Sequence, residues 1–450
     1  MDVNHRWLRR RIYRRSEILR VDQPRGDHNI GRIGFDPNQS PSDADWGNLY
    51  IALGDGGNFN NGDGMLNPNG QDTDLFLGSM LRIDPATPDT LADTPYTIPA
   101  DNPFLDDDSI LSEIWAYGLR NPHTFGWDTG GDGSMYIGDI GQSDIEEINK
   151  GQAGANYGWS EREGTFSVSG IVPPRSGPIE VNELPADHAN DGFVYPVAQY
   201  DHAPNDEDND IGNAAVVGGY VFRSDRLPAL EGKYLFGDFA NNTGPIWAVD
   251  EDQLDQQEDF TDLDSQDGGY LAPFEELTLL DDDGNEATFL DILRDSTGRS
   301  SLGRTDIRFG QGEDGEVYIM NKHDGWIRRF AAAVPGDCDG DGVLSEADLS
   351  CSCADRDPVL STLGLIAGDL DGVDGVTFAD FLVLSSNFGT GGNYADGDID
   401  CNGEVAFADF LILSSNFGAT SNITSVPEPS GCFLTLLLFV GASALLRKRR

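Results

Sequence analysis

The sequence predicts a mostly-β protein of propeller type, and three features predict it. With 55 glycines and 10 % aromatic residues among 450, the composition is more typical of an all-β protein than of a helical one. Two apolar runs, Ile114–Leu119 and Met135–Ile140, are expected strands that flank a Gly-rich turn cluster. A Gly-x-apolar-apolar-apolar unit recurs with irregular spacing, as blades separated by long loops would show, at Gly47–Ile51, Gly133–Ile137, Gly232–Phe236 and Gly315–Ile319.

Polar residues follow each of the two apolar runs. Arg120 and Asn121 end the first, and Gly141 and Gln142 end the second. A guanidinium beside an amide can hold a carboxylated ligand through a planar set of donors. Backbone carbonyls at a Gly turn can ligate a hard cation such as calcium. Strand ends capped by ordinary turn residues are the alternative interpretation.

The charge balance excludes some partners. Lysine and arginine number 29 against 78 acidic residues, a formal net charge of −49, so nucleic acid and anionic membrane surfaces are not expected partners of the folded part. Asp-x-Asp patterns favour cation binding, and a solvated acidic surface accounts for the remaining acids. There is no Gly-x-Gly-x-x-Gly motif in a βαβ setting, so a nicotinamide site of the Rossmann type is unsupported.

The motifs AYGLRNP, DIGQ followed by EEIN, and GANYGW resemble the soluble quinoprotein glucose/sorbosone dehydrogenase family over Glu17 to Phe330. The resemblance implies a six-bladed β-propeller that carries pyrroloquinoline quinone (PQQ) and calcium. It also implies oxidation of an aldose at its anomeric carbon to the lactone, with the hydride passing to PQQ. Six blades need more chain than residues 17–332, so we expect a truncated N-terminus. The basic residues 1–16 lack the apolar core of a signal peptide and are expected to lie outside the domain.

The same resemblance assigns roles to site residues. His28 would be the catalytic base, for which histidine suits neutral pH, and Asp27 would orient it or tune its charge. Arg120 and Asn121 would contact PQQ, the arginine near the quinone oxygens, where it can stabilise developing negative charge. Arg308, with Arg304 as its rival, falls near the position where the family binds a PQQ carboxylate.

Two further points concern the cofactor. The carbonyls of Gly141 and Gln142 would hold the calcium ion that polarises the quinone. The lysine of the family has no counterpart around Phe239–Asn241, which favours the alternative of a non-catalytic propeller that binds carbohydrate or protein at the cell surface. For the enzyme, the expected partners are a sugar substrate and a soluble or membrane electron acceptor.

Residues 333–422 have a different character. The segment 368–389 repeats as 397–418, and each copy runs from a calcium-type loop into FADFLxLSSNFG, an apolar pattern that predicts a short helix. The repeats resemble a dockerin type I module, which implies a cohesin-like partner; an Asp-rich linker is the alternative. By EF-hand spacing, the expected calcium ligands are Asp337, Asp339, Asp341, Val343 through its carbonyl, and Asp348; then Asp369, Asp371, Asp374 and Asp380; then Asp398, Asp400, Asn402, Glu404 and Asp409. The four cysteines between 338 and 401 could form two disulfides in three pairings.

The C-terminal residues 423–450 combine a Val-Pro-Glu-Pro motif, an apolar run from Gly431 to Leu446 and a basic end. They resemble a PEP-CTERM sorting signal, which implies export to the periplasm or cell surface, with the membrane or the sorting machinery as partner before cleavage. The apolar run is short for a spanning helix, which needs about 20 residues. A plain C-terminal membrane anchor is the alternative. Both require translocation although no signal peptide opens the chain, which agrees with a truncated start.

Overall fold

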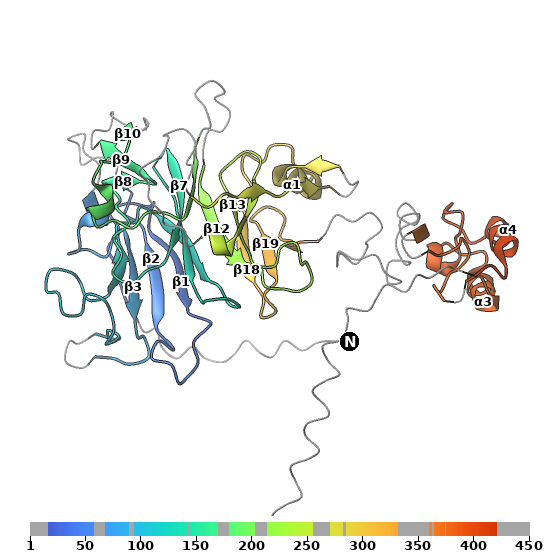
Figure 1. The fold of residues 1–450 in the computed structure, drawn as a ribbon, viewed down its shortest axis with the longest axis horizontal. Coiled ribbons are helices and arrows are strands. Elements are labelled where there is room, and N and C mark those ends of the chain that lie inside the picture. Colours follow the sequence, from blue (N-terminus) through green and yellow to red (C-terminus); the bar gives the residue numbers. More distant parts are fainter. Residues whose placement is uncertain are drawn as a thin grey trace, which may run out of the picture. The chain divides into compact units, whose positions relative to one another are not determined.

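The structure is a computed structural model (Figure 1), and it consists of two compact units, Met1–Phe330 and Ala331–Arg450. The residues that it describes are 17–57, 68–89, 94–142, 144–169, 180–202, 214–254, 271–281, 285–331, 360–361, 364–373 and 375–420. Strands dominate the first unit and helices are few and short, so the prediction of a mostly-β protein is confirmed.

Antiparallel meanders build the first unit. The first sheet contains β1 (Ile30–Phe35), β2 (Leu49–Leu53), β3 (Ser79–Ile83) and β4 (Ile114–Tyr117). The second contains β5 (Pro122–Trp127), β6 (Met135–Asp139), β7 (Ile145–Lys150) and β11 (Ala198–Asp201). The third contains β12 (Val216–Val221), β13 (Lys233–Asp238), β14 (Ile246–Asp250) and β15 (Glu275–Glu276), and the fourth β18 (Arg308–Gln311), β19 (Val317–Met320) and β20 (Ile327–Arg329).

Smaller elements complete the unit. One small sheet contains β8 (Arg162–Glu163), β9 (Phe166–Ser169) and β10 (Glu180–Asn182), and another contains β16 (Leu279–Leu280) and β17 (Glu286–Ala287). The helix α1 (Phe289–Thr297) begins at Thr288, whose side chain accepts a hydrogen bond from the Asp291 amide, and ends at Gly298 in the left-handed conformation. Short 3-10 turns cover Pro68–Gln71, His188–Asn190 and Glu251–Gln253.

The four Gly-x-apolar repeats are the second strands of the four large sheets, namely β2, β6, β13 and β19. The glycine that opens each repeat, Gly47, Gly133, Gly232 or Gly315, has a φ between +78° and +85°. Only glycine adopts this conformation without steric cost, so each glycine ends the turn from the first strand into the second. The repeat therefore marks one equivalent turn in each sheet.

The first strands of the four sheets are neighbours in the order β1, β5, β12, β18. A Cβ atom at Gly31 would lie 2.6 Å from the Pro122 carbonyl oxygen, and one at Gly34 would lie 3.2 Å from the Trp127 ring, so β1 and β5 run in the same direction. The beginnings of the first strands therefore lie at the same end of the row of sheets. Within the described residues the sheets form a row that does not close into a ring, and the number of six blades stays a prediction.

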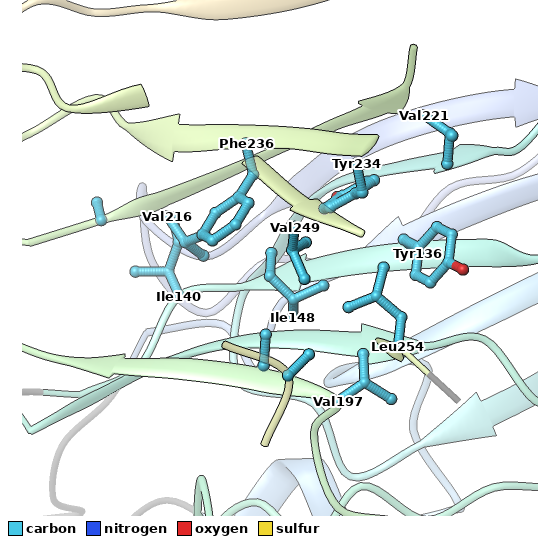
Figure 2. Packing of buried hydrophobic residues seen from close by; sticks show 13 residues of the cluster. Tyr136, Ile140, Ile148, Val197, Val216, Val221, Tyr234, Phe236, Val249 and Leu254 are labelled. Atoms are coloured by element: carbon cyan, nitrogen blue, oxygen red, sulfur yellow. The ribbon is translucent and has the colours of Figure 1, made fainter. Parts of the chain in front are cut away.

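The core of the second and third sheets is apolar and aromatic (Figure 2). Tyr136 and Tyr234 lie with ring centroids 4.8 Å apart, and Ile148, Val216 and Phe236 pack in the same buried cluster. Burying one such side chain contributes about 1.5–3 kcal/mol. This packing joins neighbouring sheets and sets the positions of the loops at their ends.

One expectation about the strand order needs correction. The runs Ile114–Leu119 and Met135–Ile140 are not consecutive strands, because β5 lies between them in the chain and β4 belongs to a different sheet from β6. Pro122 occupies the first position of β5, where a missing N–H group is tolerated.

The second unit contains the predicted helices. α3 (Phe378–Asn387) and α4 (Phe407–Asn416) cover the two FADFLxLSSN repeats, and their buried leucines, Leu384 and Leu413, share one core with Val376 and Val405. A short 3-10 turn covers Tyr394–Asp396 between them. No helix in the described part of the chain has the length and apolar character needed to cross a bilayer, and the apolar run 431–446 lies outside that part.

Candidate active site

His28 lies in the turn before β1, with a left-handed φ of 50°. Its Nδ1 atom is 2.7 Å from Asp55 Oδ1, in the loop that follows β2. Asp55 is 3 % exposed and also accepts hydrogen bonds from Trp159 Nε1 (2.9 Å) and the Gly57 amide (2.8 Å). Burial raises the pKa of Asp55, but hydrogen bonds from His28 and Gly57 and the charge of Arg120 outweigh this effect, so that the pKa is lowered overall. Asp55 is therefore an ionised acceptor that orients the imidazole.

The structure gives His28 a carboxylate partner that the sequence did not indicate, and the role of Asp27 stays a prediction. The carboxylate bonded to His28 belongs to Asp55, whereas the Asp27 carboxylate packs against Gly57. Asp55 is therefore the carboxylate that is placed to orient the imidazole.

Arg120 lies between β4 and β5 and is 5 % exposed. Its Nε and Nη2 atoms donate to Gln142 Oε1 at 3.1 and 2.7 Å, and Nη1 donates to the carbonyls of Ile140 (2.7 Å) and Gly141. Its guanidinium lies 5.5 Å from the centre of the Trp159 ring, the same ring that donates to Asp55. Arg120 and His28 are therefore joined through one buried tryptophan.

The structure brings together Arg120, Gly141 and Gln142, which the sequence predicted for the site. It also places the Arg120 guanidinium on the Gly141 carbonyl, where calcium was expected. Because the guanidinium of Arg120 donates to the Gly141 carbonyl, a calcium ion on that oxygen would compete with a cation already there. Calcium at these two carbonyls stays a prediction. Asn121 donates its backbone amide to Asp139 Oδ1 at 2.6 Å, which places it at the beginning of β5.

Arg308, at the beginning of β18, lies over an aromatic platform. Its Cζ atom is 4.7 Å from the centre of the Phe239 ring, and the His123 ring stacks on Phe239 at 5.4 Å. Burial and the nearby charges of Arg308 and Lys322 lower the pKa of His123 to about 4, so this histidine is neutral. Its Nδ1 atom is buried with no hydrogen-bond partner in the described part of the protein.

Arg304, the rival of Arg308, has a different environment. It is exposed and pairs with Asp306 at 3.0 Å. Arg308 has no carboxylate within 4.0 Å among the described residues, which leaves its charge for an anionic ligand. The sequence did not indicate that His123 and Phe239 lie in the site beside Arg308. His123 is two residues from Asn121 in the expected motif, which is the only signal that could have indicated it.

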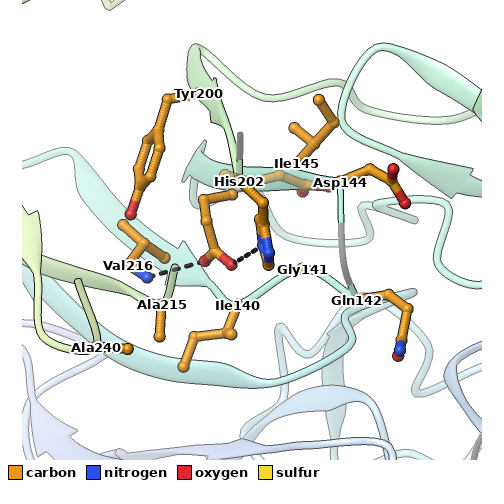
Figure 3. Close-up of polar contacts among 12 residues, drawn as sticks. Ile140, Gly141, Gln142, Asp144, Ile145, Tyr200, His202, Ala215, Val216 and Ala240 are labelled. Carbon is orange, nitrogen blue, oxygen red and sulfur yellow. Dashed lines mark hydrogen bonds and ion pairs between the residues drawn. The ribbon is translucent and has the colours of Figure 1, made fainter. Parts of the chain in front are cut away.

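A buried hydrogen bond between a histidine and a glutamate lies near the turn that carries Gly141 (Figure 3). His202 Nε2 lies 2.5 Å from Glu146 Oε1, and Glu146 Oε2 accepts from the Val216 amide at 2.8 Å. In the figure, the His202 ring points toward the Gly141 turn. Burial raises the pKa of Glu146 and lowers that of His202. The pair ties β7 to β12 and was missed because the sequence shows Glu146 only as part of an acidic run.

A second carboxylate holds the same turn from the other side. Glu163 Oε1 accepts hydrogen bonds from the amides of Gln142 (2.7 Å), Asp144 (3.2 Å) and Ile145 (3.1 Å). Burial raises the pKa of Glu163. The position of Gln142, and hence of the Arg120 side chain that donates to it, depends on this carboxylate.

In the second unit, the predicted ligands of two calcium loops come together. Two sets of carboxylate oxygens each lie within 4.8 Å of one another, and these are Asp369, Asp371 and Asp380, and Asp398, Asp400 and Asp409. Asn402 donates its amide to Asp398 Oδ1 at 3.1 Å, and Glu404 is exposed, with its amide 2.9 Å from Asn402 Oδ1. Asp337, Asp339, Asp341, Val343, Asp348 and Asp374 lie outside the described residues. Cys401 is disulfide-bonded.

Comparison with known proteins identifies relatives of the first unit. The HIPL1 protein of Arabidopsis thaliana is 30 % identical over 243 residues, which cover 51 % of this chain and 31 % of the relative. The aldose sugar dehydrogenase YliI of Escherichia coli K12 is 27 % identical over 230 residues, which cover 51 % of this chain and 50 % of the relative. The chain thus spans about a third to a half of the length of the curated relatives that it matches.

Solved structures give a weaker likeness. The apo-form of the soluble aldose sugar dehydrogenase from Escherichia coli is 23 % identical, with a TM-score of 0.40 over 66 % of this chain and 63 % of that one. The PQQ-bound aldose sugar dehydrogenase from Streptomyces coelicolor is 18 % identical, with a TM-score of 0.36 over 67 % of this chain and 60 % of that one. These scores are too low to establish a common fold.

A protein-family model matches the first unit of the chain. The family model of Glucose / Sorbosone dehydrogenase matches residues 5–266, more than half of the chain. The match begins within the basic N-terminal segment and includes His28, Asp55, Arg120 and the turn at Gly141. The chain therefore belongs to the glucose/sorbosone dehydrogenase family.

Proposed function

We propose that the first unit is a PQQ-dependent sugar dehydrogenase that oxidises an aldose at its anomeric carbon to the lactone. The observation that carries the proposal is the pair of half-buried His28 and buried Asp55, joined through Trp159 to Arg120. Family membership supports it, as does the similarity to relatives named as sugar dehydrogenases.

The tautomer of His28 determines which atom can act as the base. Nδ1 faces the ionised Asp55, so it carries the hydrogen and Nε2 has the free lone pair. Nε2 can therefore accept the proton of the anomeric hydroxyl. Asp55 stabilises the imidazolium that forms, because its negative charge lies 2.7 Å from the ring.

The residues at the beginnings of the first strands suit an anionic, planar cofactor. PQQ, when bound, supplies the hydride acceptor that no side chain provides. Arg308 offers a charge without a carboxylate partner among the described residues, and Phe239 and His123 offer flat faces beside it. Arg120 would stabilise negative charge near the reacting carbon, with Asn121 as its neighbour. No step of this mechanism uses calcium.

Two variants separate chemistry from cofactor binding. His28→Asn removes the base, so turnover of an aldose with a dye acceptor should fall by about 10²–10⁴-fold while PQQ binding survives. Arg120→Ala should weaken both turnover and PQQ binding, because it deletes a charged donor and releases Gln142. If the wild-type protein binds no PQQ with calcium present, the enzyme proposal is wrong, and the non-catalytic carbohydrate- or protein-binding propeller takes its place.

For the second unit we propose calcium binding by the loops at Asp369 and Asp398. Three carboxylates come together in each loop, which supports the proposal, because without a bound cation the negative charges within each cluster repel one another. A cohesin-like partner, export to the periplasm or cell surface, and a sorting or membrane role of residues 423–450 are proposals based on sequence resemblance. The sugar and the soluble or membrane electron acceptor are likewise proposed partners.

A further inference from the structure

A cavity of about 520 Å³ lies among the β16–β17 hairpin, α1 and β20, and none of the predicted site residues lines it. Its walls include Leu280, Asp281, Asp295, Trp326 and Arg328. The volume falls within the range of small-molecule sites. Both apolar and charged side chains line it, as in a site for a ligand with apolar and hydroxyl-bearing faces.

Trp326 is the most conspicuous of these residues because it is 63 % exposed. A rigid loop presents it: its amide donates to Asp324 Oδ1 at 3.0 Å, and Asp324 Oδ2 accepts from Ser296 (2.9 Å) and Arg328 (2.6 Å). These bonds also lower the pKa of Asp324, although burial alone would raise it. Exposing the apolar face of an indole to water costs free energy. The hydrogen bonds to Asp324 hold the loop so that the indole stays exposed, as a preformed binding surface requires.

The polar residues around the indole supply both donors and acceptors. Asp281 lies at the cavity edge, where Asn285 donates to its carboxylate at 2.8 Å, and Asp295 is exposed on α1. Arg328 Nη1 is buried and has no hydrogen-bond partner among the described residues. Carboxylates accept from hydroxyl groups, and the guanidinium donates to hydroxyl or ring oxygens.

We propose that this cavity is a non-catalytic binding site for a neutral oligosaccharide, in which a pyranose ring packs its C–H face on Trp326. Asp281 and Asp295 hold its hydroxyl groups, and Arg328 lines the same cavity. The two carboxylates and the net charge of −49 disfavour an anionic sugar. The site is independent of the proposed oxidation, because it contains neither His28 nor Arg120.

The test measures binding by calorimetry and tryptophan fluorescence on the full chain carrying His28→Asn, without PQQ, so that turnover plays no part. The probes are cellohexaose, maltohexaose and laminarihexaose. At least one should bind, and Trp326→Ala should weaken its binding at least tenfold, whereas Trp326→Phe should retain most of it. Trp46→Ala is the matched control, since Trp46 is also 55 % exposed but does not line the cavity, and it should leave binding unchanged.

Three outcomes would overturn the proposal. The first is that none of the three hexasaccharides binds, and the second is that Trp326→Ala binds as well as the parent protein. The third is that sedimentation shows a dimer which Trp326→Ala dissociates, with no saccharide binding, because the exposed Trp326 and its neighbour Ile327, 68 % exposed, would then form a protein interface. Failure of the dehydrogenase assay would not affect either result.

Discussion

His28 Nδ1 lies 2.7 Å from Asp55 Oδ1, which ties the turn before β1 to the loop after β2. The two residues are 27 positions apart, and antiparallel pairing of β1 with β2 brings them together. Leu53 pairs with Ile30, so the residues just beyond these two positions must meet at the same end of the sheet. The pair is thus a consequence of strand register.

Asp55→Asn should reduce turnover while PQQ binding is largely retained. The amide cannot stabilise an imidazolium by charge, and it also favours the wrong tautomer when its NH₂ group faces Nδ1. Steady-state kinetics and a PQQ titration measure the two effects. Asp27→Asn is the control and should change turnover much less, so equal losses in both variants would contradict the assignment of Asp55.

Arg308→Gln should weaken PQQ binding by roughly tenfold to a hundredfold, because a hydrogen bond to a charged group contributes about 1.5–3 kcal/mol. Fluorescence titration with PQQ measures the change. Arg304→Gln is the matched variant and should have a smaller effect, since Arg304 is exposed and already paired with Asp306. A larger effect at Arg304 would reverse the assignment of the two arginines.

The stability of the first unit should fall as the pH rises from about 4 to about 8. Burial raises the pKa of Glu147 from 4.5 to about 8 and that of Asp139 from 3.8 to about 7. In this window the folded state binds more protons than the unfolded state, so deprotonation favours unfolding; above the folded pKa values the dependence levels off. Thermal unfolding at successive pH values measures it.

Glu147→Gln provides the control for that dependence. A glutamine can still accept from the Gly164 amide, as Glu147 Oε1 does at 2.5 Å, but it does not titrate. The melting temperature of the variant should therefore decline less between pH 4 and pH 8. An unchanged slope would show that other groups cause the dependence.

Calcium should raise the melting temperature of the second unit in the full chain, and a chelator should lower it. Asp409→Asn should remove the part of the shift that comes from the loop at Asp398, because Asp409 lies in that carboxylate cluster and also accepts from the Ile399 amide at 2.6 Å. Glu404→Gln, at an exposed loop position, should have a smaller effect. Calorimetry with and without calcium checks this, and an unchanged transition in the wild type would count against calcium binding.

The sequence by itself determined the features that depend on local periodicity. The four glycine repeats indicated four strand units, because glycine adopts a left-handed φ at the turn before a strand without steric cost. The duplicated FADFLxLSSN segment indicated α3 and α4, since both the apolar spacing and the capping position are local. The motifs around Arg120 and Gly141 were enough to indicate the family, which the family comparison then showed.

Only the tertiary structure decided which side chains meet. His202 and Glu146 are 56 residues apart, and the platform of His123, Phe239 and Arg308 draws on three sheets. Periodicity states which face of a strand a residue occupies, but the loop that lies against that face depends on register and on packing between sheets. The family resemblance indicated Asp27 as the residue that orients His28 or tunes its charge, and only the structure shows that the Asp55 carboxylate lies 2.7 Å from His28 Nδ1.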